Sequence, residues 1–308
     1  MSVTSKISWC DSTWSPLVGC SRVSSGCANC YAVKEVRRLS GNPHPKIAAD
    51  FAGLVERHGN GQLDWTGQVR VFQDRLRQPL HWKRPRRIFV NSMSDVFHEN
   101  VPFHVIDDIF DIMKRAHWHT FQVLTKRPAR MAQWADSTNA RHDDILGGYE
   151  GPGIPNIWLG VSVETQATAD ERIPWLLKIP TAVRFISAEP LLAPIDLRAY
   201  LPMGPWHDPR GDHWCVECSR WKGALDWVIC GGESGPKARP CDLDWLRSVV
   251  QQCQVSGVPC WVKQVGRWPY EVSELDRAYP LKTKHKAGAD PAEWPSDLQV
   301  QQMPEGRV

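Results

Sequence analysis

The chain has 308 residues, of which 42% are hydrophobic and 23% are charged, and its formal net charge is +3. This length and composition exclude a low-complexity or fibrous protein and suit one large α/β domain or two ordinary ones. No apolar run approaches the roughly 18 residues that cross a bilayer, and the N-terminus lacks the apolar core of a signal peptide. We therefore expect a cytoplasmic protein with no membrane partner. The small charge does not exclude nucleic acid, because charge can gather on one face.

Cysteine and tryptophan are both frequent, with 10 and 16 copies. In a chain without a secretion signal, cysteines are expected to stay reduced and to serve as metal ligands or core residues. Most tryptophans are expected in the core or at its rim, while some could line a pocket for a planar ligand or a base.

The chain begins with a predicted strand at residues 7–9, a cysteine loop, and a predicted helix at 31–39. Residues 40–65 are rich in Gly, Pro and His and are expected to connect, with one helical piece at 47–57. A short alternating run at 68–72 and a helix at 75–82 complete this part.

The cysteine loop holds Cys20, Cys27 and Cys30 in the spacing C-x6-C-x2-C. Two thiolates two residues apart can bind one metal centre, and the third can close the set across a loop rich in Ser and Gly. A four-iron cluster on three thiolates leaves one iron free for chemistry, whereas structural zinc needs a fourth ligand. The spacing therefore leaves three alternatives, which are a cluster, a zinc site with a distant fourth ligand, and inert core thiols.

A series of similar units follows, in which apolar strands alternate with amphipathic helices. The predicted strands lie at 87–91, 120–125, 156–163, 183–188, 227–230 and 259–265, and the helices at 102–116, 129–134, 168–177 and 242–256. With the first strand this gives about six to seven parallel strands. Polar residues end nearly every strand, which favours an α/β fold of the partial (β/α) barrel type over a doubly wound open sheet. In a barrel these strand-end residues share one rim: Cys20, Asp95, Lys126, Glu164, Glu189, Glu233 and Lys263.

Two regions interrupt the series. Residues 136–155 form a polar Gly-rich loop, and 197–224 form an insertion that contains His207, His213, Cys215 and Cys218. The insertion could hold a small zinc knuckle or be an exposed loop with spare thiols. We expect one barrel domain over 1–268 and an irregular C-terminal extension over 269–308.

Three stretches carry a resemblance: ISWCDSTWSPLVGCSRVSSGCANCYA, RIFVNSMSDVFHENVP, and VICGGESGPKARPCDLDW with KQVG after it. With a three-cysteine loop after the first strand of a partial barrel, the chain resembles the radical S-adenosylmethionine (radical SAM) enzymes. It more closely resembles an uncharacterised family, common in phages and prophages, that is regarded as radical-SAM-like. The resemblance covers about residues 6–266. The chain departs from the common radical SAM loop, C-x3-C-x2-C with an aromatic residue before the last cysteine, since its first gap is x6 and Tyr31 follows Cys30.

This resemblance implies a metal centre and a cofactor. Cys20, Cys27 and Cys30 would ligate a [4Fe-4S] cluster, whose fourth iron binds the methionine end of S-adenosyl-L-methionine. An electron from a donor such as flavodoxin or ferredoxin would then release a 5'-deoxyadenosyl radical that abstracts hydrogen from an unactivated carbon. A phage-encoded enzyme of this kind would work in the host cytoplasm.

The resemblance also implies roles for residues at the strand ends. Ser94 and Asp95, within the segment 92–95, would bind the cofactor's amino group, Lys126 its carboxylate, and Ser162 and Glu164 its ribose hydroxyls. A second set is left for catalysis on the cofactor or substrate: Glu189, Glu233 and Lys263. Each could instead be a solvated strand-end residue or part of a structural ion pair.

The implied substrate is a nucleic-acid base or a modified nucleotide, in DNA modification, isomerisation or repair. The basic run WKRPRR at 82–87 could contact phosphates or simply be the solvated start of a strand. One competing hypothesis is a zinc-binding nucleic-acid-binding or scaffold protein, with Cys10 as the nearest fourth ligand. Another is a barrel that keeps the fold and cluster but serves only as a partner.

Overall fold

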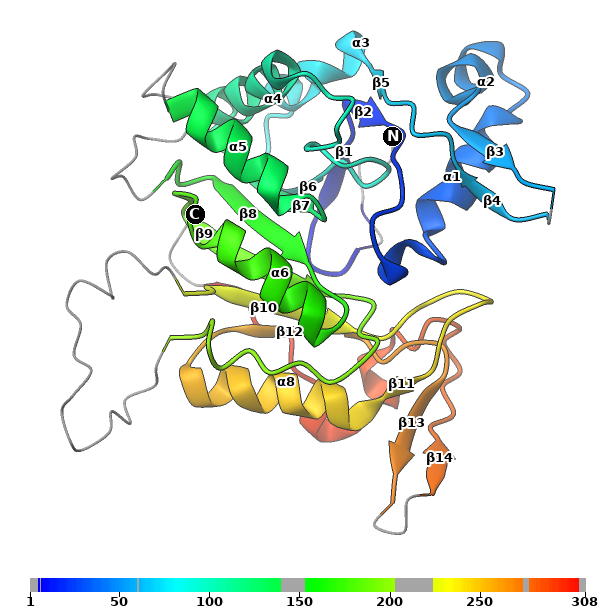
Figure 1. Ribbon diagram of the computed structural model, residues 1–308, viewed down its shortest axis with the longest axis vertical. Coiled ribbons are helices and arrows are strands. Elements are labelled where there is room, and N and C mark those ends of the chain that lie inside the picture. The colour runs from blue at the N-terminus through cyan, green and yellow to red at the C-terminus, as the bar shows by residue number, and fades with distance from the viewer. Residues whose placement is uncertain are drawn as a thin grey trace. The chain divides into compact units, whose positions relative to one another are not determined.

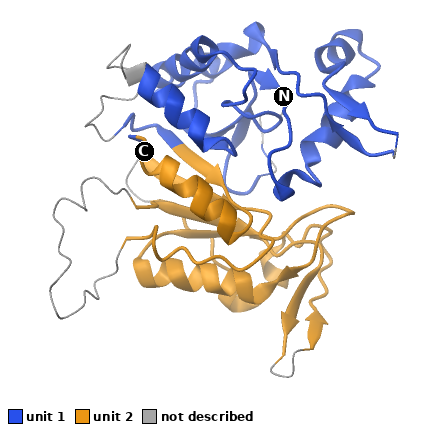
Figure 2. Cartoon of the chain, in the orientation of Figure 1, with its two compact units in different colours: residues 1–158, 180–182, 308 blue, residues 159–179, 183–307 orange. Residues whose placement is uncertain are grey.

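The computed structural model describes residues 5, 7–59, 61–139, 153–202, 224–273 and 277–304. The chain divides into two compact units (Figure 2). Unit 1 comprises residues 1–158, 180–182 and 308, and unit 2 comprises residues 159–179 and 183–307.

Seven strands form one sheet in the order β1-β6-β7-β8-β9-β10-β12 (Figure 1). The pairs β1–β6, β6–β7, β9–β10 and β10–β12 are parallel. Strand order follows chain order without the reversal that a doubly wound sheet requires, so the fold is the predicted partial β/α barrel. The strands are β1 (Ser12–Trp14), β6 (Arg87–Val90), β7 (Thr120–Thr125), β8 (Ile157–Ser162), β9 (Val183–Ala188), β10 (Trp227–Gly231) and β12 (Cys260–Gln264).

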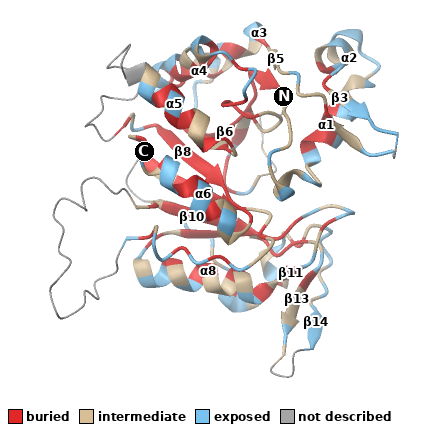
Figure 3. Ribbon diagram, viewed as in Figure 1, coloured by how far each residue is buried: buried red, intermediate tan, exposed pale blue. Residues whose placement is uncertain are grey.

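The helices between these strands pack through apolar stripes. In α4, Ile106, Ile109 and Phe110 are fully buried at the spacing that places them on one helix face. Every residue of β8 is buried (Figure 3), as expected for a parallel strand covered on both faces. The main helices are α1 (Tyr31–Ser40), α4 (Phe103–Arg115), α5 (Pro128–Asn139), α6 (Gln166–Leu176) and α8 (Leu243–Ser256).

The helix ends follow from local sequence. Thr165 caps α6 in a reciprocal capping box with Thr168, and the Asp242 side chain caps α8 by accepting from the Asp244 N–H. Gly257 ends α8 in the left-handed conformation with φ 70°, which glycine adopts without steric cost. These signals explain why the predicted helices at 168–177 and 242–256 were located within two residues of their observed bounds.

The region expected to connect, residues 40–65, has more structure than predicted. The helix expected at 47–57 ends at Phe51, and a hairpin of β3 (Val55–Arg57) and β4 (Leu63–Trp65) follows. Beyond it, β5 (Arg70–Val71) pairs with β2 (Leu17–Val18), which precedes the cysteine loop. The remaining short helices here are α2 (Pro45–Phe51), α3 (Gln73–Leu76) and the 3-10 turn η2 (Gln78–His81).

The two ends of the described chain also differ from expectation. The first strand lies at Ser12–Trp14 and not at 7–9, where Trp9 instead packs in a turn against Phe89 with ring centroids 4.9 Å apart. The C-terminal part is not wholly irregular, because a small sheet joins β11 (Cys241–Asp242), β13 (Pro269–Val272) and β14 (Ala278–Pro280). The turns η3 (Pro291–Glu293) and η4 (Ser296–Leu298) follow.

Two sequence expectations concern the insertion and the membrane. His207, His213, Cys215 and Cys218 lie outside the described residues. Among the described helices, none combines the length and apolarity needed to span a bilayer.

Close packing between β8 and β9 gives a test of the fold. A Cβ atom at Gly160 would lie 2.5 Å from the ring of Phe185, whereas one at Gly59 would meet nothing within 4 Å. We expect Gly160→Ala to lower the free energy of unfolding by about 1–3 kcal/mol through overpacking, and Gly59→Ala to change it by under about 0.5 kcal/mol. Urea unfolding of both variants measures this, and equal midpoints would contradict the described packing.

Candidate functional site

The cysteine loop is fixed to the segment that follows β6. The backbone N–H of Gly19 donates to the Met93 carbonyl at 3.1 Å, and the Ser94 hydroxyl donates to the Leu17 carbonyl at 3.0 Å. Gly19 has φ 108°, and a Cβ there would lie 2.1 Å from the Gln68 carbonyl oxygen, so only glycine fits. Cys20 is therefore held beside the end of β6.

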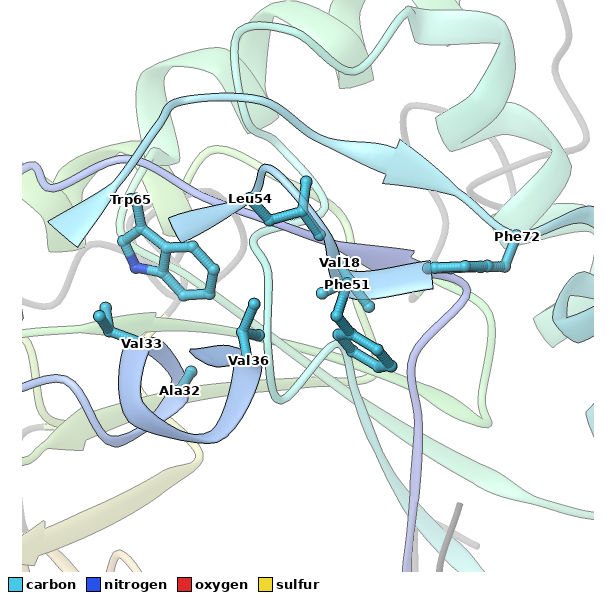
Figure 4. Packing of buried hydrophobic residues seen from close by; sticks show 8 residues of the cluster. All are labelled: Val18, Ala32, Val33, Val36, Phe51, Leu54, Trp65 and Phe72. Carbon is cyan, nitrogen blue, oxygen red and sulfur yellow. The ribbon is translucent and has the colours of Figure 1, made fainter. Parts of the chain in front are cut away.

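A small hydrophobic core packs against this loop. Its side chains come from β2, α1, α2 and the hairpin region (Figure 4). Cys20, Cys30 and Met93 pack against it as partly buried residues. The core consists of Val18, Ala32, Val33, Val36, Phe51, Leu54, Trp65 and Phe72. The helices and strands of residues 40–72, which were not predicted, thus contribute to the core that packs against the cysteine loop.

The three predicted metal ligands lie in one electrostatic environment. Burial raises the pKa of the Cys20 thiol to about 12, and burial also raises the pKa of Cys30. The N–H groups of Ala32 and Val33, in the first turn of α1, oppose the rise at Cys30. A charge on Cys27 raises the pKa of both other thiols, so Cys27 lies within electrostatic range of each. Binding a cation would relieve this cost by taking the place of the protons.

Asp95 is buried and organises the ends of β6 and β7. Its carboxylate accepts from the Thr125 hydroxyl at 2.7 Å, from the Phe97 and Lys126 N–H groups at 3.0 Å, and from Arg127 at 3.2 Å. An ionised carboxylate has about four lone-pair sites, so these donors fill it. The cofactor's amino group, which sequence analysis assigned to Asp95, would have to displace one of them.

Arg127 joins this network to the cysteine loop and was not assigned a role from sequence. Its guanidinium donates to the Cys20 sulfur at 3.7 Å, to the Ser21 hydroxyl at 2.7 Å and to Glu99 at 3.1 Å. Its side chain is only 6% exposed. The neighbouring Lys126, which was assigned a role, is partly exposed, and its charge lowers the pKa of Cys30. Both basic residues therefore act on the cysteine loop.

His98 completes the network and was also missed, although it lies within the motif RIFVNSMSDVFHENVP. Burial lowers the pKa of His98, and the charge of Arg127 lowers it further, so the ring is neutral at pH 7. Its Nδ1 accepts from the Asn100 N–H at 3.1 Å, which places the proton on Nε2, 3.0 Å from the Ser21 hydroxyl. Ser21 is thus held from two sides.

In unit 2, the strand-end residues predicted to bind ribose are tied to α6. The Glu164 carboxylate is fully buried and lies 3.2 Å from Arg172, which also donates to the Ser162 carbonyl at 2.7 Å. Both side chains are at most 3% exposed. A ribose contact by Glu164 remains a prediction, and it would have to compete with a buried ion pair.

The residues predicted for catalysis in unit 2 are paired as well. Lys263 lies 2.6 Å from Glu189, which also accepts from Gln264 at 3.2 Å. Arg239 donates three hydrogen bonds to the Glu233 carboxylate, at 2.8 Å from its backbone N–H and at 2.8 and 2.7 Å from its guanidinium. The side chains of Glu189 and Lys263 are 16% and 24% exposed, so this pair is accessible while Glu233 is buried. Glu189 and Lys263 are the more suitable residues for contact with a ligand.

The cysteine loop supplies three thiols, which is the number that a four-iron cluster with one open iron needs, whereas a structural zinc ion needs a fourth ligand. Within the ranges that the structure describes, no three His, Cys, Asp or Glu side chains are grouped to hold one metal ion. Sulfurs that share one zinc ion all lie about 2.3 Å from it and so nearly touch. In a cluster each thiolate takes its own iron, which lets the sulfurs stand further apart. The described positions of the three sulfurs therefore do not by themselves identify the metal centre.

The basic run at 82–87 is partly used in internal contacts. Arg87 pairs with Asp11 at 2.8 Å, and Arg86 lies over the Trp82 ring at 5.0 Å. Lys83 and Arg84 are exposed. They precede β6, at the opposite end of that strand from the segment that holds Asp95.

The buried pair of Glu164 and Arg172 gives a stability test. Arg172→Met leaves an uncompensated buried carboxylate, and we expect it to lower the free energy of unfolding by about 3–5 kcal/mol. The matched control is Arg198→Ala, which removes an 81% exposed partner of Asp196 and should cost under about 1 kcal/mol. Urea unfolding compares the two, and similar losses in both would contradict the burial of the pair.

Comparison with known proteins gives one match. No curated protein and no solved structure matches the chain significantly. The model of one protein family, described as "Protein of unknown function (DUF5131)", matches residues 4–296. This match covers nearly the whole chain, including the cysteine loop and every described strand-end residue above. The chain therefore belongs to the DUF5131 family.

Proposed function

We propose that the protein is a radical SAM enzyme that acts on a nucleic-acid base or a modified nucleotide. The observation that carries the proposal is the position of the cysteine loop. Three thiols in the spacing C-x6-C-x2-C follow the first strand of a partial β/α barrel, and one of them is anchored to the ends of the next two strands. The residues that would hold a [4Fe-4S] cluster are Cys20, Cys27 and Cys30.

The chemistry would come from the bound group. When bound, such a cluster supplies one electron to S-adenosylmethionine, and the 5'-deoxyadenosyl radical that this releases takes a hydrogen atom from the substrate. The chain's own part is to place the three sulfurs, to keep their surroundings dry and to orient the cofactor.

The residues near the cysteine loop suit the second and third tasks. Cys20 and Cys30 pack against the small hydrophobic core, which offers an apolar surface on that side. Lys126 carries a positive charge near Cys30, which suits a carboxylate ligand there. The Tyr31 hydroxyl donates to the Ser92 carbonyl at 2.6 Å, so Tyr31 bridges the start of α1 and the segment after β6. We propose that this segment and Lys126 bind the methionine part of the cofactor.

The substrate part of the proposal is supported by the resemblance to phage and prophage proteins. In unit 2, we propose that the accessible Glu189 and Lys263 contact the cofactor or the substrate. The two side chains carry opposite charges and lie 2.6 Å apart. A polar ligand that reaches the pair can accept a hydrogen bond from Lys263 or donate one to Glu189.

Metal content tests the proposal. After anaerobic reconstitution with iron and sulfide, we expect about four irons per wild-type chain and less than about one in Cys27→Ala, because three thiolates are needed to hold the cluster. Adding S-adenosylmethionine and a strong reductant should then release 5'-deoxyadenosine from the wild type alone. Iron analysis and chromatography of the nucleoside give the two readings.

Cys10→Ala is the matched control for this test. Cys10 is buried, its thiol donates to the Ser5 hydroxyl at 3.2 Å, and it is the nearest fourth ligand of the zinc alternative. We expect this variant to keep wild-type iron. One zinc ion per wild-type chain, lost in both variants and without uptake of iron, would replace the proposal with a zinc-stabilised binding protein.

A further inference from the structure

Arg127 links the segment after β7 to the cysteine loop through its guanidinium. Its Nη1 lies 3.7 Å from the Cys20 sulfur and 3.2 Å from Asp95. Its Nη2 donates to the Ser21 carbonyl at 3.1 Å and to the Ser21 hydroxyl at 2.7 Å, and its Nε donates to Glu99 at 3.1 Å. One buried guanidinium thus joins the loop to both neighbouring strand ends.

The geometry requires arginine and not merely a positive charge. Five N–H donors in a planar fork reach acceptors on several sides at once, whereas a lysine ammonium is a single point with three donors. Asp95 fixes the direction of the fork, because Asp95 is itself held by the Thr125 hydroxyl and the Lys126 N–H. The N–H that faces Cys20 therefore has little freedom to turn away.

We propose that Arg127 is a positioning residue that seats Cys20 in the cysteine loop and donates a hydrogen bond to its sulfur, which makes a bound cluster easier to reduce. This inference rests on the proposed function. Hydrogen bonds to ligand sulfurs stabilise the extra negative charge of a reduced cluster and so raise its reduction potential. Asp95 and Glu99 offset the charge of Arg127, so the effect comes mainly from the directed N–H and not from net charge.

The test compares Arg127→Lys with Arg130→Lys. Arg130 lies on α5 three residues further on and donates to the Val101 carbonyl at 2.8 Å, so its replacement is a matched change away from the cysteine loop. In reconstituted protein, we expect Arg127→Lys to lower the ratio of reduced to oxidised cluster about tenfold at a fixed potential, equivalent to a fall of about 59 mV for one electron. Arg130→Lys should keep the wild-type potential. Redox titration followed by electron paramagnetic resonance measures both.

A second reading uses the metal-free protein. Arg127 lowers the pKa of Cys20, so its loss also reduces the reactive thiolate, and each labelling rate is divided by the thiolate fraction that its pH dependence gives. Loss of the contacts to Ser21 frees the loop, so on this scale we expect maleimide labelling of Cys20, followed by peptide mass spectrometry, to be about tenfold faster in Arg127→Lys than in the wild type. If Arg127→Lys does not fold, Ser21→Ala replaces it, since it removes only the hydroxyl acceptor and should speed labelling about two- to threefold.

The two readings separate the possible failures. An unchanged potential in an iron-loaded Arg127→Lys protein would overturn the redox role, and unchanged labelling would overturn the seating role. A wild-type protein that takes up no iron overturns the proposed function together with the redox role, and labelling then decides the seating role alone. Faster labelling with a lowered potential supports the whole inference.

Discussion

The ion pair between Asp95 and Arg127 is the interaction on which the cysteine loop depends. Both side chains are under 10% exposed, so the pair is stable only because every polar atom around it is satisfied by a neighbour. The Asp95 carboxylate also accepts hydrogen bonds from the Thr125 hydroxyl and from the N–H groups of Lys126 and Phe97. The Arg127 guanidinium also donates to Ser21, Glu99 and the Cys20 sulfur. A buried charge network of this kind fixes one arrangement and penalises alternatives. This network holds three segments in register, which are the cysteine loop and the segments after β6 and β7.

Unit 2 contains three further ion pairs between a strand-end carboxylate and a basic side chain. Glu164, Glu189 and Glu233 each follow a strand of the sheet, and each carries a basic partner within its own unit, namely Arg172, Lys263 and Arg239. The strand-end carboxylates predicted for the site are therefore also members of structural ion pairs. The three pairs differ in solvent exposure, because the Glu164 pair is buried while the Glu189 pair is partly exposed. A ligand in this unit is expected to meet Glu189 and Lys263 first.

Sequence patterns predicted most strands of the main sheet but not the short elements that pack beside it. The strands at Thr120–Thr125 and Val183–Ala188 were predicted at their observed bounds, because each is rich in apolar and β-branched residues with only Gln122 or Arg184 as a strongly polar residue inside the run. The hairpin of β3 and β4 was missed because its strands have three residues each and are stabilised by packing on α1, which sequence periodicity does not report. The first strand was misplaced for a similar reason, since Trp9 is buried in a turn.

The ion-pair and hydrogen-bond partners of the predicted site residues could not be predicted from the sequence either. Lys126 and Arg127 are adjacent and both basic, and only the direction of the chain after β7 decides that Arg127 turns inward. Arg172 reaches Glu164 from eight positions further on, across the capped turn that begins α6, so no helical spacing rule connects them. Candidate residues could thus be named from sequence, but their pairing depends on how helices fold back over strands. His98 was missed although it lies within the motif RIFVNSMSDVFHENVP, which offered a signal for it.

The central claim of this account is that the cysteine loop holds an iron–sulfur cluster. The most direct measurement is the iron K-edge X-ray absorption spectrum of the anaerobically reconstituted protein. The account predicts an iron shell dominated by sulfur together with a clear iron–iron shell, because three thiolates and bridging sulfides surround several irons. Iron with only oxygen or nitrogen neighbours and no iron–iron shell would contradict it.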